Sequence, residues 1–180
     1  RIAPDRKHAA VFRHDPSRAH SLPTDGVMSL FEDSAGRVWV GTYGGGLSRF
    51  APATRDFRSG APDAEPSNPL RSGRVTALTE DNEGRIWAGT DGAGLHVLMP
   101  MTSTTRQWLH NAADTYSLGA DTIYALHVDA SGTLWIGTHG RGLDRVNVQT
   151  RDLSQLKFIH NRETQGLPDN TVYSILSDDE

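Results

Sequence analysis

The sequence predicts an all-β fold, a segment of a β-propeller built from four-stranded antiparallel blades. The motif Trp-x-Gly-Thr occurs three times in the 180-residue chain, starting at Trp39, Trp87 and Trp135, with a spacing of 48 residues. Short segments rich in β-branched and aromatic residues surround each copy, and no segment shows helical periodicity. A fixed period of this size is typical of propellers and other repeat architectures. We therefore expect about three blades plus flanking strands.

The first expected strand of each repeat starts with a β-branched residue and runs for about five residues. Its copies are 27–31, 75–79, 123–127 and 172–176. The third position is always small, and its occupants are Ser29, Ala77, Ala125 and Ser174. A small side chain is expected on the innermost strand of a blade, which is crowded near the propeller axis. This strand is therefore assigned to the inner edge.

A tight hairpin of the form Asp-x-x-Gly separates the first strand from the second. Its copies begin at Asp33, Asp81 and Asp129. Glycine accepts the positive φ of such turns, and aspartate can bind the turn backbone. The second strand, exemplified by 38–40, is apolar at successive positions, so both of its faces should be covered by neighbouring blades.

A glycine-rich turn leads to the third strand, which begins at Leu47, Leu95 and Leu143. The fourth strand is expected at 56–58, 107–109 and 157–159, with an earlier copy at 11–13. Four antiparallel strands per repeat describe a propeller blade. A two-sheet sandwich is the alternative, but sandwiches rarely repeat their turn chemistry at a fixed period.

The expected blade units are 22–69, 70–117 and 118–166, and a fourth unit starts at 167–180. Such an arc does not close into a ring, and an open arc exposes apolar blade faces and strand edges. We therefore expect the segment either to be part of a larger propeller or to associate with copies of itself. The first residue is Arg1 and no signal segment follows it, so the chain is expected to be excised from a longer protein.

The composition excludes several classes of protein. Hydrophobic residues make up 36% of the chain and charged residues 22%, and no apolar run is long enough to span a membrane. The formal net charge is −4 and no stretch concentrates Lys or Arg, so nucleic acid is not an expected partner. Cysteine is absent, which excludes disulfides and thiolate metal sites.

These motifs resemble the two-component regulator propeller repeat. In the first unit the family pattern runs from Leu22-Pro23 through Glu32-Asp33 and Trp39-Val-Gly-Thr42 to Gly45-Gly46-Leu47, and the other two units match in register. The departures are Val128 in place of Glu, and Ala93 and Arg141 in place of the first glycine of the pair.

The resemblance implies the sensor region of a bacterial hybrid histidine kinase or a related diguanylate cyclase, in a periplasmic or extracytoplasmic location. The kinase or cyclase and any membrane anchor would lie outside this chain, which is itself expected to be non-catalytic. The ligands of the family include carbohydrates. We therefore expect a small-molecule ligand or a protein partner, and no cofactor.

Residues that recur in every unit are interpreted as scaffold. The repeated tryptophan is expected to pack between blades, and the repeated threonine to bond to the backbone rather than act as a nucleophile. The repeated aspartates are interpreted as turn formers. The eight histidines show no pair at metal-ligand spacing, so no metal site is predicted.

The candidate ligand-binding residues are those that differ inside this constant frame. Tyr43, Asp91 and His139 follow the Gly-Thr pair in the three units, and Arg141 comes two positions after His139. The loops that lead into the first strands form a second candidate ring, from which Asp25 and Asp121 are selected.

Two other functions remain open. A propeller enzyme of the lyase type would use one singular acid or base near the channel, and His127 is the only histidine on an inner strand. A purely structural module would instead join sensors through its blades, and no ligand would then change its stability.

Overall fold

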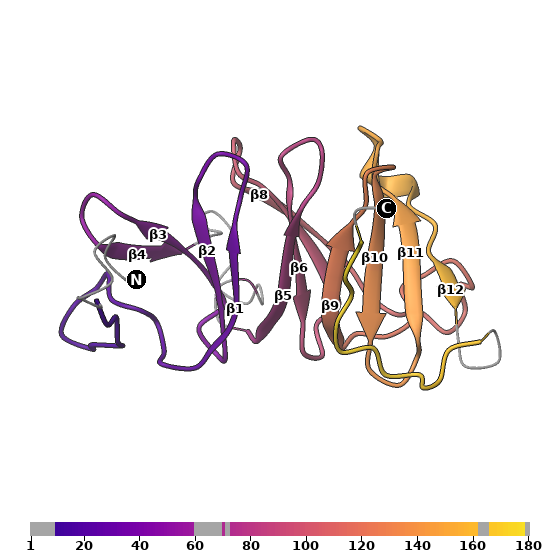
Figure 1. Ribbon diagram of the computed structural model, residues 1–180, viewed down its shortest axis with the longest axis horizontal. Coiled ribbons are helices and arrows are strands. Elements are labelled where there is room, and N and C mark those ends of the chain that lie inside the picture. Colours follow the sequence, from indigo (N-terminus) through magenta and orange to yellow (C-terminus); the bar gives the residue numbers. More distant parts are fainter. Residues whose placement is uncertain (1–9, 60–69, 71–72, 162–165, 179–180) are drawn as a thin grey trace.

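The β-strands form three four-stranded antiparallel sheets that lie side by side along the long axis of the molecule (Figure 1). The computed structural model describes residues 10–59, 70, 73–161 and 166–178. Each sheet contains four strands that are consecutive in the chain and adjacent in space. The predicted all-β propeller architecture is therefore confirmed.

Each sheet is one blade. Blade 1 consists of β1 (Val27–Glu32), β2 (Val38–Thr42), β3 (Leu47–Ala51) and β4 (Asp56–Ser59). Blade 2 consists of β5 (Val75–Glu80), β6 (Ile86–Thr90), β7 (Leu95–Met99) and β8 (Thr104–Trp108). Blade 3 consists of β9 (Ile123–Val128), β10 (Thr133–Thr138), β11 (Leu143–Asn147) and β12 (Ile159–Asn161), with the short 3₁₀ helix η1 (Leu153–Gln155) before its last strand.

Two of the three repeat tryptophans, Trp39 and Trp87, pack between blades, as predicted. Trp39 belongs to a buried cluster that includes Val75 and Ile86 of blade 2, and Trp87 to one that includes Ile123 of blade 3. Trp87 is completely buried, whereas Trp135 is half-buried. The core therefore lies mainly at the interfaces between sheets.

The glycine of Trp-x-Gly-Thr allows neighbouring blades to approach closely. A Cβ atom added to Gly41 would lie 2.6 Å from the carbonyl oxygen of Val75 and 2.9 Å from its Cγ1. The same close approach joins Gly89 to Ile123 and Gly137 to Val172. The first residue of each inner strand thus packs over the glycine of the preceding blade, which explains why this position carries no side chain.

Each pairing of an inner strand with its neighbour contains a register shift at the second residue of the inner strand. In blade 3, Ile123 pairs with Thr138 and Ala125 with Gly137, so Tyr124 is the extra residue of a β-bulge. The equivalent shifts occur in blades 1 and 2. Bulges redirect a side chain out of the regular alternation of a strand.

Two predicted strands are not strands in the structure. Residues 11–13 form no ladder, and Phe12 instead packs edge-on against Phe50 and Phe57. Residues 172–176 follow blade 3, where Val172 donates to the carbonyl oxygen of Thr138 at 3.1 Å, but no strand is assigned there. A strand needs a continuous ladder with a partner, and the described residues supply none for either segment.

The outer strands of blades 2 and 3 also differ from prediction. The expected 107–109 is observed at Thr104–Trp108, and the expected 157–159 at Ile159–Asn161. An outer strand contacts only one neighbour and is solvent-exposed, so its apolar pattern is weak. The outer strand of blade 1 was predicted almost completely.

The face of β1 that points away from blade 2 is open. Val27 and Leu30 are 45% and 68% exposed, whereas their equivalents in blade 2, Val75 and Leu78, are 0% and 9% exposed. A preceding blade covers this face in blade 2 but not in blade 1. The expectation of self-association, or of a larger propeller, stays a prediction.

Candidate functional site

The aspartate of each hairpin holds both the turn and the tryptophan. Asp33 Oδ1 accepts hydrogen bonds from the backbone N–H groups of Ala35 and Arg37, and its Oδ2 accepts from Trp39 Nε1 at 2.7 Å. The same indole bonds join Asp81 to Trp87 at 2.6 Å and Asp129 to Trp135 at 2.8 Å. The prediction that these aspartates form turns is confirmed. Their bond to the indole was not predicted, although the constant six-residue spacing was a usable signal.

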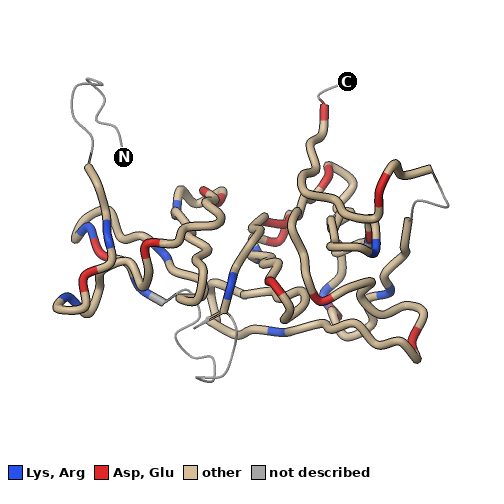
Figure 2. The backbone as a smooth tube through the Cα atoms, turned by 90° about the horizontal axis from the view of Figure 1, so that it is seen from below, with Lys and Arg blue, Asp and Glu red and all other residues tan. Residues whose placement is uncertain are grey.

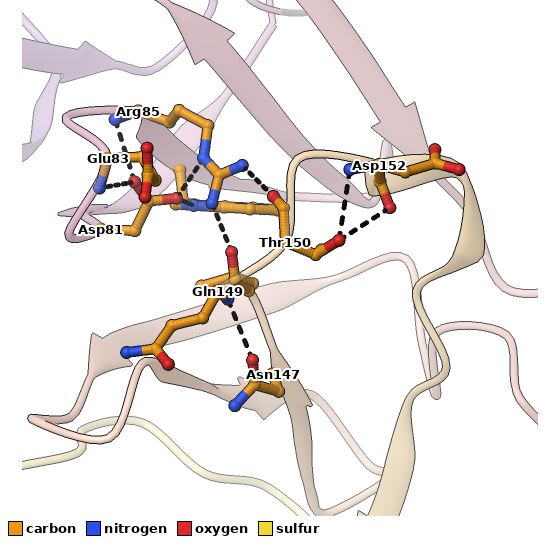
Figure 3. A network of polar contacts seen from close by, with 9 residues as sticks. Asp81, Glu83, Arg85, Asn147, Gln149, Thr150 and Asp152 are labelled. Carbon is orange, nitrogen blue, oxygen red and sulfur yellow. Dashed lines mark hydrogen bonds and ion pairs between the residues drawn. The ribbon is translucent and has the colours of Figure 1, made fainter.

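Arg85 connects the Asp81 hairpin of blade 2 to blade 3 (Figure 3). Its Nε donates to Asp81 Oδ2 at 2.6 Å, its Nη1 donates to the carbonyl oxygen of Thr150 at 2.8 Å, and its Nη2 donates to that of Val148. Arg85 and Asp81 are both buried. The network fixes the chain after β11 against the hairpin of blade 2, and it is a structural anchor between blades.

The threonines of the repeat bond to the backbone, as predicted. Their hydroxyls donate to the carbonyl oxygens of Gly46, Gly94 and Gly142 at 2.9, 2.7 and 2.7 Å respectively. All three threonines are completely buried. This engagement and burial exclude them as solvent-accessible nucleophiles.

The two candidate rings of loops form one surface, which we call the turn face. In each blade the residue after Gly-Thr donates its backbone N–H to the loop that leads into the inner strand. The pairs are Tyr43 to Gly26 at 2.7 Å, Asp91 to Arg74 at 3.1 Å and His139 to Thr122 at 3.0 Å. The turn of blade 2 also donates to the next blade, through Gly92 and Gly94 to the carbonyl oxygen of Asp121.

A row of polar side chains crosses the turn face. The Arg74 guanidinium lies 4.7 Å from the ring centroid of Tyr43, and its Nη1 donates to Asp91 Oδ2 at 2.6 Å. The hydrogen bond to Asp91, reinforced by Tyr43, raises the pKa of Arg74. Thr122 Oγ1 donates to the other oxygen of Asp91 at 3.4 Å. The row therefore links all three blades and is accessible to solvent.

An aromatic cluster lies on blade 3 and the segment that follows it. The rings of Tyr124 and Tyr173 are stacked, with centroids 5.1 Å apart and an angle of 10° between planes. His139 contacts Tyr124 edge-on at 5.6 Å. Tyr173 is 70% exposed, so one of its sides is open to solvent. The cluster offers a flat apolar surface with a polar ring at its border.

Four of the six sequence-predicted residues are distributed over three environments. Tyr43 and Asp91 belong to the polar row, and His139 to the aromatic cluster. Arg141 lines a pocket in blade 3. Their role in binding stays a prediction.

Asp25 and Asp121 each have an internal partner. Asp25 Oδ1 accepts the backbone N–H of His14 at 2.7 Å, and Asp121 Oδ1 accepts that of His110 at 2.6 Å. One oxygen of each carboxylate therefore ties down the connection between blades. A ligand role for these two residues stays a prediction.

Sequence reasoning missed three residues of the turn face, which are Arg74, Tyr124 and Tyr173. The two tyrosines occupy the second position of the inner-strand pattern, where the other units carry Met28 and Thr76. That disagreement between copies was a usable signal. The importance of the position depends on the β-bulge, which the strand pattern does not reveal.

The buried histidines form no catalytic or metal-binding cluster in the described part of the chain. Burial lowers the pKa of His96 to about 4, so this ring is neutral at pH 7. The Nδ1 atom of His96 and the Nε2 atom of His127 have no hydrogen-bond partner among the described residues. Those residues also contain no group of three His, Asp or Glu side chains that could hold a metal ion. His127 lies opposite Trp135 in the β9–β10 ladder.

We expect the chain to lose stability as the pH falls from about 4 to 2. Burial alone would raise the pKa of Asp129, but hydrogen bonds from Ser131, Trp135 and the backbone outweigh it and lower the pKa from 3.8 to about 2. A carboxyl whose folded-state pKa is depressed stabilises the fold above its unfolded pKa, and this contribution disappears as the pH falls through the folded pKa.

Urea denaturation at a series of pH values measures this effect. Asp129→Asn should reduce the slope of the free energy of unfolding between pH 4 and 2, whereas Asp178→Asn, at an exposed position, should leave it unchanged. Identical slopes for Asp129→Asn and the unaltered chain would contradict the expectation.

Acidic and basic residues are interspersed along the described part of the chain (Figure 2). No stretch of the tube gathers Lys and Arg into a continuous basic face. In addition, the described residues include no helix of sufficient length and apolar character to cross a membrane.

Two solved structures of the extracellular domain of BT4673 from B. thetaiotaomicron resemble this chain. One, described as a one-component system, is 28% identical over 92% of this chain with a TM-score of 0.68, and 21% of that chain is covered. The other, described as a hybrid two-component system, is 27% identical over 91% of this chain with a TM-score of 0.67, and 20% of that chain is covered.

The extracellular domain of the hybrid two-component system BT3049 from the same organism shares the fold. It is 23% identical over 84% of this chain, with a TM-score of 0.63 and 20% of its own length covered. The present chain thus spans about one fifth of the length of these structures. No curated protein matches the chain.

The family description "Two component regulator propeller" matches residues 21–44, 69–92 and 117–140. Each match contains the end of a connecting loop, the inner strand, the Asp-x-x-Gly hairpin and the Trp-x-Gly-Thr strand. The matched segments are therefore the parts of each blade that hold the tryptophan and the turn face. The chain is a propeller segment, and each of its three blades carries a match to the two-component regulator propeller repeat.

Proposed function

We propose that this chain is the ligand-recognition part of an extracytoplasmic sensor, without catalytic activity of its own. The stacked pair of half-buried Tyr124 and exposed Tyr173 beside His139 is the observation that carries the proposal. The resemblance to extracellular domains of two-component systems supports the location and the signalling context. A histidine kinase or diguanylate cyclase in the full-length protein would supply the output.

Carbohydrate is the ligand class that we propose for the turn face. A sugar ring has apolar C–H faces and polar hydroxyls at its edge, so it matches a flat aromatic surface bordered by hydrogen-bonding groups. Tyr124 and Tyr173 would contact the sugar face, and His139 would bind hydroxyls. Arg74 and Asp91 would extend the polar border toward blade 1.

A thermal-shift screen with neutral mono- and disaccharides tests the proposal, followed by calorimetry on any sugar that raises the melting temperature. We expect Tyr173→Ala and Tyr124→Ala to weaken sugar binding at least about tenfold, which corresponds to about 1.4 kcal/mol. Tyr116→Ala is the matched control, because Tyr116 is exposed on the connecting loop before β9 and lies outside the cluster.

Two outcomes would count against sugar recognition at this surface. One is a null result across a broad sugar panel, and the other is an equal loss of binding in the Tyr116→Ala control. A purely structural role is the second candidate, and the exposed Val27 and Leu30 on the open face of β1 favour it.

A further inference from the structure

Two pockets of the turn face occupy equivalent places in blades 1 and 3. The blade 1 pocket has a volume of about 320 Å³ and lies against the 14–23 loop. The blade 3 pocket has a volume of about 290 Å³ and lies against the 110–119 loop, two repeat lengths further along the chain. His14 Nδ1 lies 2.8 Å from the carbonyl oxygen of Leu22, and His110 Nδ1 lies 2.7 Å from that of Leu118. The two pockets therefore share one loop scaffold.

Three positions around this scaffold change together between the two blades. Blade 1 carries Pro23, Gly45 and Ser48, and blade 3 carries Gly119, Arg141 and Asp144. His160 is a further member in blade 3, because it pairs with Asp144 across the β11–β12 ladder.

The glycine in blade 3 makes room for the two charged residues. In blade 1, a Cβ on Gly45 would lie 2.8 Å from both Cβ and Cγ of Pro23, so that corner has no space for a side chain. Gly119 stands at the proline position in blade 3, where Arg141 replaces Gly45. A Cβ on Gly119 would in turn lie 2.7 Å from both carboxylate oxygens of Asp144.

Asp144 and His160 fix the wall of the blade 3 pocket. Asp144 is completely buried, its Oδ2 accepts the N–H of Gly119 at 2.6 Å, and its Oδ1 lies 2.6 Å from His160 Nδ1. The other ring nitrogen of His160 lies 3.1 Å from the carbonyl oxygen of Thr115. A carboxylate and a carbonyl are both hydrogen-bond acceptors, so each ring nitrogen of His160 faces an acceptor.

The repeat itself does not need this buried charge. Ser48 takes the same place in blade 1 without a carboxylate, and burying a charged group costs free energy unless it is paired. The blade scaffold can therefore form without the buried Asp144–His160 pair, which is an addition in blade 3. Their effect is to hold β12 against the 110–119 loop.

Arg141 stands at the pocket without an internal partner. It is exposed and makes no hydrogen bond or ion pair within the described part of the chain. His110, Asn111 and Asp114 line the same pocket. Among the described residues that line the pocket, Asp114 carries the carboxylate that would oppose an anion, and its Oδ1 accepts the N–H of Tyr116 at 2.9 Å. An unpaired guanidinium presents a planar fork of donors that fits carboxylate, sulfate or phosphate oxygens.

We propose that the blade 3 pocket binds the anionic group of a small molecule through Arg141. The shared chemistry is a carboxylate, sulfate or phosphate group, and the pocket volume restricts it to a small ligand or to the end of a larger one. Asn111 supplies a side-chain amide that lines the same pocket, and the Asp144–His160 pair holds the wall in place. This site is separate from the tyrosine cluster and does not depend on the proposed sugar recognition.

Nuclear magnetic resonance titration of the chain with sulfate, phosphate and acetate at constant ionic strength tests the proposal. We expect at least one anion to shift the Arg141 Nε–H signal saturably. Arg141→Gln should then raise the Kd, followed on neighbouring amide signals, by a factor of about ten or more, and Arg141→Lys should give an intermediate value. Arg18→Gln, in the equivalent blade 1 pocket, is the matched control and should leave the Kd unchanged.

The pattern of binding identifies the anionic group, since the three anions are titrated separately. Absence of saturable binding by all three would overturn the proposal, as would equal affinities of the Arg141→Gln and Arg18→Gln variants. Tyr173→Ala separates this site from the proposed function. Anion binding should persist in that variant even when the response to sugars is lost.

Discussion

Replacing Asp81 with Ala is expected to lower the free energy of unfolding of the chain by about 3–5 kcal/mol. The Oδ2 atom of Asp81 accepts from Trp87 Nε1 and from Arg85 Nε, both at 2.6 Å. Its Oδ1 accepts the backbone N–H groups of Glu83 and Arg85. Without this carboxylate, a buried guanidinium loses its counter-charge and a buried indole loses its acceptor. Both losses leave polar groups unsatisfied in the core.

Urea denaturation followed by tryptophan fluorescence and by circular dichroism measures this change, provided that the two transitions coincide. Asp129→Ala is the matched control at the same hairpin position of blade 3. Thr133 stands there in place of the arginine, and Trp135 is only half-buried. We expect a loss of about 1 kcal/mol in the control. Equal losses in both variants would show that the buried ion pair adds nothing to the anchor between blades 2 and 3.

The second large effect is expected at Gly89. Replacement by Ala should lower the free energy of unfolding by about 1–3 kcal/mol, because it overpacks the interface between blades 2 and 3. The added Cβ would lie 2.6 Å from Cγ2 of Ile123 and 3.0 Å from its Cβ. Ile123 is completely buried, so the two sheets must separate to make room.

A double-mutant cycle identifies the partner of this glycine. Ile123→Ala alone should cost about 2–5 kcal/mol through the cavity that it leaves. In combination with Gly89→Ala the total should be less than the sum, because Ala at 123 removes the colliding Cγ2. Gly92→Ala is the control: no atom would lie within 4 Å of its Cβ, and its cost arises from a φ of +86°. That control should be additive with Ile123→Ala, and additivity of the Gly89 pair would contradict close packing between blades.

The repeated residues of this chain could be assigned roles before the structure was known. Trp39, Trp87 and Trp135 recur at one spacing, and this recurrence indicated a packing element rather than a catalytic one. The threonine hydroxyls were likewise assigned to backbone bonds, and the structure confirms it. The role of the threonines is local, because each hydroxyl bonds to a neighbour within the same blade. The order of residues within one repeat unit is therefore sufficient to predict such a role.

Two flanking segments were predicted as strands from their local composition, and this prediction was wrong. Residues 11–13 and 172–176 have the composition of strands, yet neither is a strand in the structure. Strand composition describes a preference, whereas a strand forms only when a second segment supplies a ladder of hydrogen bonds. The shift of β8 and β12 from their expected positions has the same origin. An outer strand is positioned by its single neighbour and by the length of the connection that precedes it.

The sequence by itself determined the repeat, the order of strands in each blade, the Asp-x-x-Gly hairpins and the resemblance to the two-component regulator propeller repeat. Only the tertiary structure decided that the two candidate rings form one turn face. It also decided that Arg74 pairs with Asp91 and that Gly119, Arg141, Asp144 and His160 meet around one pocket. The physical reason is that these contacts join residues of different strands, loops and blades. Their distances are set by the twist within each sheet and by the close approach of neighbouring sheets at the repeat glycines, and neither quantity appears in the pattern of a single unit.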